Sequence, residues 1–383
     1  MLVQDITSQF AQTNDFASRA LFAQVNRQQQ VVLQFSHYHA QQQAQLIQLC
    51  QQLDGVVQVD ATKLTVLLTQ TAARQLTTHW PQVFRDQAMV QGQLTQIMKQ
   101  YDIYWQAGEK RFNLTDKPMI YGIMNITPDS FYDGGQYKTM TDVLNHVDEM
   151  LQAGADVIEV NGQTTRPGFK EVTPEVELDR TLPYIRAIKQ HFPEAVIAID
   201  TYKYDVMQAV LTEGVSIIND VNAFTDDPRK LRLMADSRVG LLTMHSSRDQ
   251  EYTDLTSSMR QFFEQNIAAL TGAGIDLERI ALDQGIGYAK VAHGEQDYVM
   301  MRNIDEFNYL KRPMMVAISR KGYLGLLLGL KKEDRLPMTL VAEAAMMLKG
   351  GQILRVHDVA ETKQMVTLLD RIDQGYWLAT DHD

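Results

Sequence analysis

Polar residues able to do chemistry recur at one point of the sequence pattern, directly or shortly after short apolar runs. Amides, carboxylates, imidazoles and an amine are represented, so together they can accept and donate hydrogen bonds, move protons and carry charge. They are Asn125, Asn161, Asp200, Asn219, His245, Asp283, Lys321 and His357. A single such residue is most often a cap at the end of a strand. Eight at the same phase of a repeat predict one shared site.

Cationic residues gather after the last two apolar runs, in the segments Ser319–Lys321 and Arg355–His357. Arginine offers a planar fork to phosphate oxygens, lysine a point charge, and histidine a hydrogen bond and, when protonated, a charge. Arg166, in the loop after the second run, adds a third cation. We therefore predict a bound oxyanion. Surface ion pairs explain Arg320 and Arg186 better.

Asp200, Asp283 and Asn219 close the third, sixth and fourth runs. Two carboxylates and an amide can hold a metal ion, act as acid and base, or read the edge of a flat heterocycle, whose N–C–N group matches a carboxylate in two places. The pattern alone leaves these three uses open. No His, Cys and Asp cluster has the spacing of a zinc site, so a catalytic zinc is not expected.

The apolar runs are the elements that must position these residues. There are eight, at residues 121–124, 157–160, 196–199, 216–218, 240–244, 280–282, 315–318 and 353–356. Amphipathic stretches such as 143–151, 259–270 and 340–348 lie between them. Strand and helix repeated eight times predict a (β/α)8 barrel, which carries its active site at the carboxyl ends of its strands. The polar loop 125–135 is either a lid over that site or an ordinary surface loop.

The first part of the chain has a different composition, rich in Gln and poor in Lys. We place a domain boundary there, with residues 1–115 as a small α/β domain and 116–383 as the barrel. Strands are expected at 31–35, 56–59 and 64–68, and helices at 40–53 and, as one long stretch, at 71–99. Nothing in this part carries catalytic chemistry, and the sequence does not decide its role.

Composition sets the class of protein. Of 383 residues, 45% are hydrophobic and 22% charged, as in ordinary globular proteins, and the net charge is −11. This charge argues against a general binder of nucleic acid or of membrane surfaces. With Cys50 alone no disulfide forms within the chain, and the first residues do not resemble a signal peptide, so a cytoplasmic location is expected.

Seven segments of the chain resemble, in the same order, the motifs of the dihydropteroate synthase family. They are residues 122–135, 154–168, 199–203, 218–220, 282–287, 319–321 and 355–358. The resemblance covers about residues 118–375 and leaves the first 115 outside. It implies that a dihydropterin-methyl pyrophosphate loses pyrophosphate and that the amine of para-aminobenzoate attacks the methylene carbon, by a dissociative route through a pterin-stabilised cation. The enzyme must then bind the pterin, assist the leaving group and hold the amine in line.

The resemblance also implies roles for individual residues. The pterin would be held by Asp200, Asn219, Asp283 and Lys321. Asn125 would meet a Mg²⁺ ion on the pyrophosphate, whose charge Arg166, Arg355 and His357 would take. Thr165, Pro167, Tyr288 and Gly322 would line the aminobenzoate pocket. Asp133 would close the site and stabilise the developing cation, and with Arg166 and Lys321 would form the catalytic set. Family members usually dimerise, so a homodimer is expected.

The chain departs from the family pattern mainly near the aminobenzoate side. Gly322 stands where the family usually has Ser, Gln284 where it has Pro, and Tyr288 where it has Phe. Asn161 and Gln163 replace the usual Gly and Glu of the second motif, and the two residues after His245 also differ. Backbone N–H groups near Gly322 could still bind the aminobenzoate carboxylate.

Two other functions compete with the synthase. A pterin-dependent methyltransferase on the same barrel would keep the pterin residues, but it has no use for the cations Arg166, Arg355 and His357. A non-catalytic paralogue would be expected to lose loop residues, yet Asn125 and Asp133 are present. The synthase is therefore the reading that the sequence favours.

Overall fold

The computed structural model describes residues 1–13, 15–115, 117–126, 139–163, 171–247, 252–288 and 294–378. The chain divides into two compact units. The first contains Met1–Asp102 together with the end of the chain from Thr367, and the second contains Ile103–Val366. The two units are described separately.

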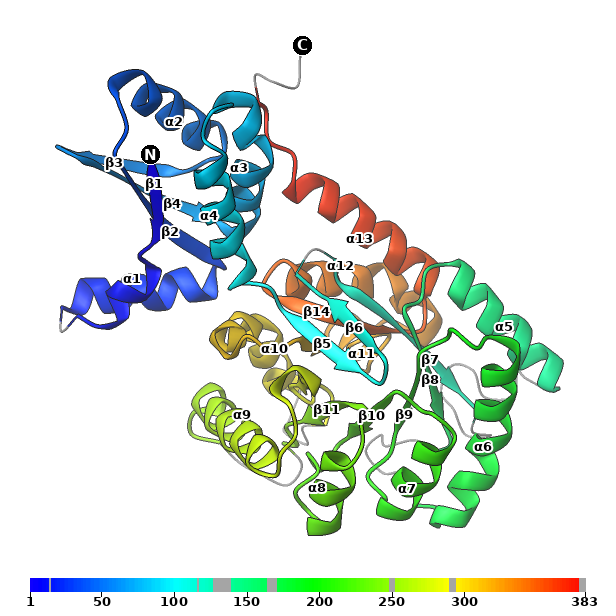
Figure 1. The fold of residues 1–383 in the computed structure, drawn as a ribbon. Helices are drawn as coiled ribbons and strands as arrows, with labels where there is room; N and C mark the ends of the chain where they lie inside the picture. The colour runs from blue at the N-terminus through cyan, green and yellow to red at the C-terminus, as the bar shows by residue number, and fades with distance from the viewer. Residues whose placement is uncertain are drawn as a thin grey trace. The chain divides into compact units, whose positions relative to one another are not determined.

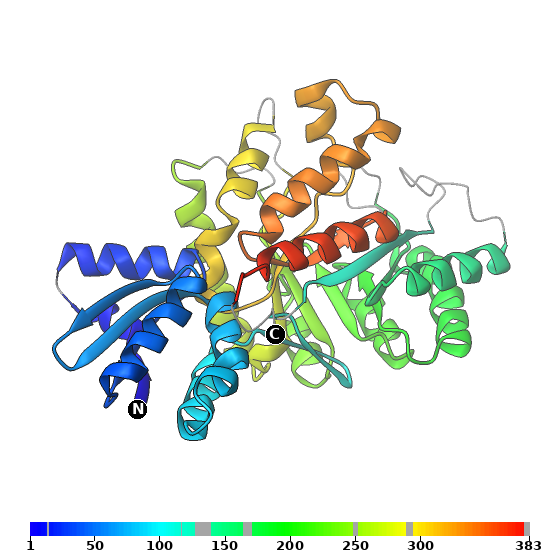
Figure 2. The same ribbon diagram turned by 90° about the horizontal axis from the view of Figure 1, so that it is seen from above.

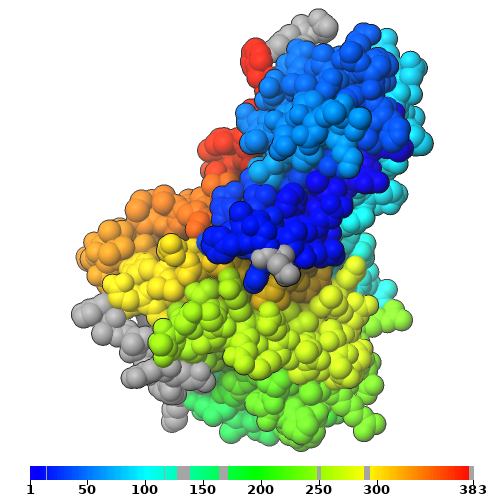
Figure 3. Space-filling view, turned by 90° about the vertical axis from the view of Figure 1, so that its left-hand side faces the viewer, coloured from blue at the N-terminus to red at the C-terminus, as the bar shows by residue number. Residues whose placement is uncertain are grey.

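The first unit is built on a four-stranded antiparallel sheet in the order β1-β2-β4-β3. Along β4 alternate side chains, Leu64, Val66 and Leu68, are buried because successive residues of a strand point to opposite faces. Their face belongs to one core with α2, α3 and α4, while Val25 of α1 packs with Val32 on the other face. Helix α1 lies at the surface (dark blue in Figure 3). The bounds are β1 Leu2–Asp5, α1 Phe16–Arg27, β2 Gln30–Ser36, α2 Ala40–Gln52, β3 Val56–Asp60, β4 Lys63–Thr69, α3 Gln70–Val83 and α4 Ala88–Lys99.

The single long helix expected over 71–99 is wrong, because two helices occupy that stretch. Helix α3 ends at Val83 and α4 begins at Ala88. Phe84 leaves the helical conformation (φ −122°, ψ 65°) and is buried against Trp80, with the two ring centroids 4.3 Å apart. Pro81 removes one helical N–H donor just before this point. The helix therefore ends where it lacks a backbone hydrogen bond and where a non-helical backbone buries the Phe84 ring.

The second unit is a closed barrel of eight parallel strands in the order β10-β11-β12-β13-β14-β7-β8-β9. Each of the eight apolar runs of the sequence supplies one strand, so the predicted (β/α)8 barrel is confirmed. The strands are β7 Met119–Asn125, β8 Val157–Asn161, β9 Ile197–Asp200, β10 Ile217–Asp220, β11 Gly240–Met244, β12 Ile280–Asp283, β13 Met314–Val316 and β14 Gly351–Val356. Most of their residues are buried because barrel strands are covered on both faces.

Helices surround the strands (Figures 1 and 2). Their apolar stripes and the outward-facing strand residues form one continuous core. The helices are α5 Met140–Gln152, α6 Pro174–His191, α7 Tyr204–Thr212, α8 Pro228–Ala235, α9 Leu255–Gly272, α10 Glu295–Arg302, α11 Tyr323–Leu328, α12 Leu336–Met347 and α13 Val359–Asp373. In the described part of the chain, no helix is long and apolar enough to cross a membrane.

A hairpin that the sequence did not predict, β5 (Tyr104–Ala107) and β6 (Lys110–Asn113), packs on the barrel. Trp105 is fully buried with the residues of the barrel interior, and its indole N–H donates to the carbonyl of Arg279 at 3.0 Å. The hairpin comes so close to β11 that a Cβ on Gly240 would lie 3.1 Å from the Cβ of Ala107. Glycine at 240 is what permits this approach.

The hairpin explains why the division of the chain differs from the boundary placed at 115. Residues 103–115 carry their apolar side chains into the barrel and so belong to it. At the other end, Leu378 is buried in the core of the first unit, and Asp373 accepts a hydrogen bond from Thr71 at 2.8 Å. The end of the chain, assigned to the barrel from the sequence, therefore returns to the first unit.

Candidate active site

The carboxyl ends of the barrel strands bring together the predicted pterin residues. Asp200 ends β9 and is paired in register with Asn219 of the neighbouring strand β10. Asp283 ends β12, and Lys321 follows β13. Asp200, Asn219 and Asp283 are buried. Four residues that are far apart in the sequence thus share one end of one barrel.

Two acceptor atoms of this group have no hydrogen-bond partner in the described structure. They are the Oδ1 atoms of Asp200 and Asn219, both fully shielded from solvent. Buried polar atoms are nearly always hydrogen-bonded, and leaving one unpaired costs about 1–3 kcal/mol. By contrast, Oδ1 of Asp283 accepts from the backbone N–H of Gly285 at 2.8 Å. Neighbouring unpaired acceptors in a barrel mouth are what a ligand with several N–H donors would satisfy.

Glu159 is a further charged residue of the site that the sequence analysis missed. It lies on β8, is completely buried, and accepts from Nε of Arg355 at 3.0 and 3.1 Å. A terminal nitrogen of the same guanidinium contacts Glu159 and also donates to Oδ2 of Asp200 at 3.2 Å. Glu159 reads in the sequence as one more residue of an apolar run. A carboxylate inside such a run was the signal that could have found it.

Asn161 connects this ion pair to both sides of the site. Its amide N–H₂ donates to Glu159 at 2.6 Å and to Oδ1 of Asn125 at 3.3 Å. Its amide oxygen accepts from the backbone N–H of Asp200 at 3.2 Å. Asn161, Glu159, Arg355 and Asp200 thus form a closed ring of hydrogen bonds across strands β8, β9 and β14, which fixes the Asp200 carboxylate.

Burial dominates the ionisation of this site. It raises the pKa of Asp200 to about 7, with Arg355 opposing the rise and Glu159 and Asp283 adding to it. Burial also raises the pKa of Asp283, against the lowering effect of Lys321. The pKa of Lys321 is lowered, again mainly by burial. Perturbed groups of both charges close together at one end of a barrel are typical of functional sites.

Lys321 is held over the mouth by the chain that follows β12. Its ammonium group donates to the carbonyl of Ile286 and lies 5.5 Å from the ring centroid of Tyr288. The turn that permits this needs glycine, because Gly285 has φ +74° and a Cβ there would lie 2.1 Å from the carbonyl oxygen of His245. Lys321 and Tyr288, predicted on opposite sides of the reaction, are therefore neighbours.

His357 is a neutral hydrogen-bonding group at neutral pH. Burial and the nearby Arg355 lower the pKa of His357 to about 3. Its Nδ1 lies 3.0 Å from the hydroxyl of Ser319.

Arg320 forms a buried two-pronged ion pair with Asp358, with both contacts at 2.7 Å. The prediction that Arg320 belongs to a surface ion pair was therefore wrong about its location.

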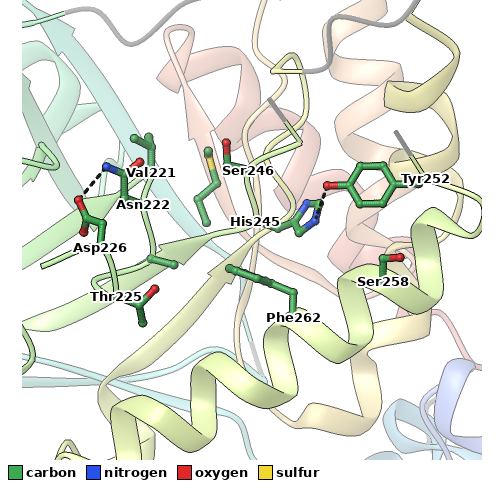
Figure 4. Close-up of a pocket in the computed structure, with 11 residues that line it drawn as sticks. Val221, Asn222, Thr225, Asp226, His245, Ser246, Tyr252, Ser258 and Phe262 are labelled. Carbon is green, nitrogen blue, oxygen red and sulfur yellow. Dashed lines mark hydrogen bonds between the residues drawn. The ribbon is translucent and has the colours of Figure 1, made fainter. Parts of the chain in front are cut away.

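A cavity of about 680 Å³ lies at the ends of β10 and β11 (Figure 4). It is lined by Val221, Asn222, Ala223, Thr225, Asp226, Met244, His245, Ser246, Tyr252, Ser258 and Phe262. The Tyr252 hydroxyl lies 3.2 Å from Nε2 of His245, and burial lowers the pKa of His245 to about 4. The predicted rim residue His245 thus lines this cavity as a neutral imidazole.

Comparison with known proteins settles the family. The family described as pterin binding enzyme matches residues 121–357. The chain is 36% identical to the dihydropteroate synthase of Streptococcus pyogenes over 264 residues, 68% of this chain and 98% of that protein. It is 35% identical to that of Bacillus subtilis over 255 residues, 67% of this chain and 88% of that protein.

Solved structures agree with the sequence relatives. The structure of Xanthomonas albilineans dihydropteroate synthase with 4-aminobenzoic acid matches with a TM-score of 0.65 at 32% identity, over 71% of this chain and 98% of that one. The Yersinia pestis enzyme in complex with a sulfonamide drug matches with a TM-score of 0.66 at 31% identity, over 70% and 99%.

The chain belongs to the dihydropteroate synthase family. The resemblance predicted from the motifs is therefore confirmed, and with it the assignment to the transferases of this type. The family's part of the chain is the barrel unit. The first hundred residues precede the matched region.

Several predicted family residues lie outside the described part of the chain: Asp133, Thr165, Arg166 and Pro167. Among the described residues, Asn125 ends β7 beside Asn161, and Gly322 precedes the short helix α11. Among the same residues, no three His, Cys, Asp or Glu side chains are placed together so that they could hold a metal ion.

Proposed function

We propose that the chain condenses 6-hydroxymethyl-7,8-dihydropterin pyrophosphate with para-aminobenzoate, giving 7,8-dihydropteroate and pyrophosphate for folate biosynthesis. The observation that carries this proposal is the pair of buried, unpartnered oxygens of Asp200 and Asn219 at the mouth of a family barrel. The pterin edge presents N–H donors side by side, which a carboxylate and an amide oxygen accept in one plane.

The remaining pterin contacts follow from charge and position. Asp283 and Lys321 are close enough for each to shift the pKa of the other, so they form an acceptor and a donor on the opposite wall of the pocket. The Lys321 ammonium lies 5.5 Å from the ring centroid of Tyr288, and it would donate to a ring nitrogen or oxygen of the pterin. In a water-poor pocket these preset dipoles stabilise developing charge more strongly than water does.

The leaving group is the pyrophosphate, which departs with the electron pair of the carbon–oxygen bond. Arg355 and His357 would bind it at the ends of the last strand, together with Arg166 from the second loop. Arg355 is already paired with Glu159 and Asp200, so it would act while still tied to the pterin carboxylate. His357 would contribute a hydrogen bond and no charge, given its lowered pKa.

Mg²⁺ is the cofactor that this chemistry calls for. The ion prefers oxygen ligands and usually keeps several waters, bound through few protein groups and the phosphates of the substrate. Asn125 fits such a role, because its side chain carries an amide oxygen at the carboxyl end of β7, beside Asn161. Mg²⁺ bound there would neutralise pyrophosphate charge.

The aminobenzoate would lie on the side of Tyr288 and Gly322, with Thr165 and Pro167 of the second loop and Asp133 of the first completing the site. In the dissociative route the pyrophosphate leaves first, and the amine would then attack the methylene carbon of the cation and lose one proton. At Gly322 the missing side chain leaves open space, since a Cβ there would meet nothing within 4 Å. The carboxylate of the second substrate has room at this point.

We also propose that two chains associate through α11 and α12 in the cytoplasm. Val341 of α12 and Leu348, the residue that caps the end of this helix, are each 61% exposed and lie seven residues apart, on one side of the helix. Leu326, Leu327 and Leu328 of α11 are exposed as well. Exposed apolar side chains on α11 and α12 and at the end of α12 favour a protein partner, and an identical chain is the simplest one.

The proposed activity is tested by following pyrophosphate release and dihydropteroate formation together, with Mg²⁺ and both substrates. We expect both products, and the loss of both in Arg166→Ala and Lys321→Ala. The matched control is Arg186→Ala, whose guanidinium pairs with Glu213 on the surface and should be dispensable.

Two other results would contradict parts of the proposal. Pyrophosphate release without dihydropteroate would leave the pterin half intact and refute para-aminobenzoate as the acceptor. Binding of the pterin without either product would refute the synthase and favour a non-catalytic pterin-binding protein.

A further inference from the structure

A buried lysine outside the pterin pocket joins the two ends of the second loop. Lys203 uses its ammonium group for three short hydrogen bonds: to the side-chain oxygen of Gln163 at 2.6 Å, to the carbonyl of Val172 at 2.6 Å and to the carboxylate of Glu177 at 2.7 Å. Lys203 and Glu177 are both buried. Residues 163 and 172 flank the segment 164–170, so the lysine contacts the chain on both sides of it.

Gln163 makes the same connection independently. Its side-chain oxygen also accepts from the backbone N–H of Val172 at 3.0 Å. Its amide N–H₂ lies 3.3 Å from the hydroxyl of Tyr202, which in turn donates to Glu171 at 2.8 Å. The two flanks are therefore linked by three routes, through Lys203, through Gln163 and through Tyr202.

The linking residues stand next to the pterin carboxylate in the chain. Tyr202 and Lys203 come two and three residues after Asp200, at the junction of β9 and α7. Residues 163 and 172, on the two sides of the second loop, are thereby connected to the strand end that carries Asp200. We propose that Lys203 and Gln163 are positioning residues, which hold the second loop in register with the pterin pocket. This inference rests on the proposed function insofar as the loop supplies Thr165, Arg166 and Pro167.

The amide of Gln163 suits this role better than a carboxylate would. Tyr202 has one hydroxyl proton, and it goes to Glu171, so its oxygen must accept from residue 163. An amide can donate that hydrogen bond while its oxygen accepts from Lys203 and Val172. A carboxylate at 163 cannot donate, and it would place a second negative charge beside Glu177 around a single lysine.

The test compares Gln163→Leu and Lys203→Met with the control Lys230→Met. Lys230 is also a buried lysine bound to two carboxylates, Asp220 at 2.8 Å and Asp226 at 2.6 Å, but it follows β10 and has no hydrogen bond to the second loop among the contacts described. In the two test variants we expect the amide of Val172 to exchange its hydrogen about tenfold faster, as the loss of one or two ordinary hydrogen bonds implies. The control should leave this exchange unchanged.

Kinetics with the Mg²⁺-loaded enzyme complete the test. We expect the KM for para-aminobenzoate to rise severalfold in both test variants, while the dissociation constant of the free pterin alcohol changes less than about twofold, and Lys203→Arg to restore part of the loss. Gln163→Leu keeps the Lys203–Glu177 pair, so it carries the test if Lys203→Met does not fold.

Hydrogen exchange at Val172 separates this inference from the proposed activity, because it needs no turnover. An unchanged exchange rate in Gln163→Leu would overturn the positioning role even in an active synthase. An equal acceleration in the Lys230→Met control would also overturn it, by reducing the effect to general destabilisation. Faster hydrogen exchange at Val172 in an inactive chain would support the positioning role of Lys203 and Gln163 and would refute only the proposed synthase activity.

Discussion

Binding of the pterin should strengthen as the pH rises from 6 to 8, because the ligand needs the ionised form of Asp200. Burial raises the pKa of that carboxyl to about 7, with Arg355 opposing the rise. At pH 6 about a tenth of the carboxyl is then ionised, and at pH 8 about nine-tenths. Only the ionised form accepts two N–H donors at once, so the affinity should rise about ninefold across this range, or ~1.3 kcal/mol at 25 °C.

The assay is a calorimetric titration with the pterin alcohol, which carries no phosphate and so adds no phosphate titration of its own. Asp200→Asn should bind weakly and lose the pH dependence. Glu343→Gln is the control, because burial raises the pKa of Glu343 to about 8 and Asp358 adds to it, at a place outside the pterin pocket. Its titration curve should match the wild type. Constant affinity between pH 6 and 8, or affinity that falls as the pH rises, would refute the role given to Asp200.

Three further changes test other parts of the molecule. Gly322→Ser should alter the free energy of unfolding by less than about 0.5 kcal/mol in thermal unfolding, since the new Cβ meets nothing within 4 Å. The added hydroxyl should lower the KM for para-aminobenzoate in steady-state kinetics. Glu159→Ala should cost about 3–5 kcal/mol in urea unfolding because it leaves the Arg355 charge buried with one partner fewer, and a loss below about 1 kcal/mol would contradict that account. Val341→Asp should shift the chain from dimer to monomer in sedimentation velocity; a wild-type monomer would refute the proposed interface.

The barrel was predictable because its strands are short apolar runs at a regular spacing. Each run has a buried strand as its counterpart, and the polar residues that follow lie at the carboxyl ends, as parallel strands require. This reasoning alone predicts that Asp200 and Asn219 lie at the same end of the barrel. The hairpin around Trp105 could not, since a four-residue strand leaves little periodic signal and its burial depends on a barrel far along the chain.

Burial changed the meaning of several charged residues. In the sequence, Arg355 and His357 were interpreted as two groups that bind a phosphate. In the structure the Arg355 guanidinium is paired with Glu159 and Asp200, and His357 is neutral. Arg320 read as a surface residue and is a buried ion pair. Charge type is visible in a sequence, but desolvation and partners decide ionisation, and both depend on neighbours distant in the chain.

The sequence by itself determined the barrel and the family, and it predicted which residues bind the pterin, because periodicity and motifs are local properties of the chain. The tertiary structure alone decided which oxygens remain unpaired, how Asn161 and Glu159 fix Asp200, and how Lys203 joins residues 163 and 172. Most of those features depend on contacts between strands and loops separated by tens to hundreds of residues. Their energies arise only when folding removes water from all partners together.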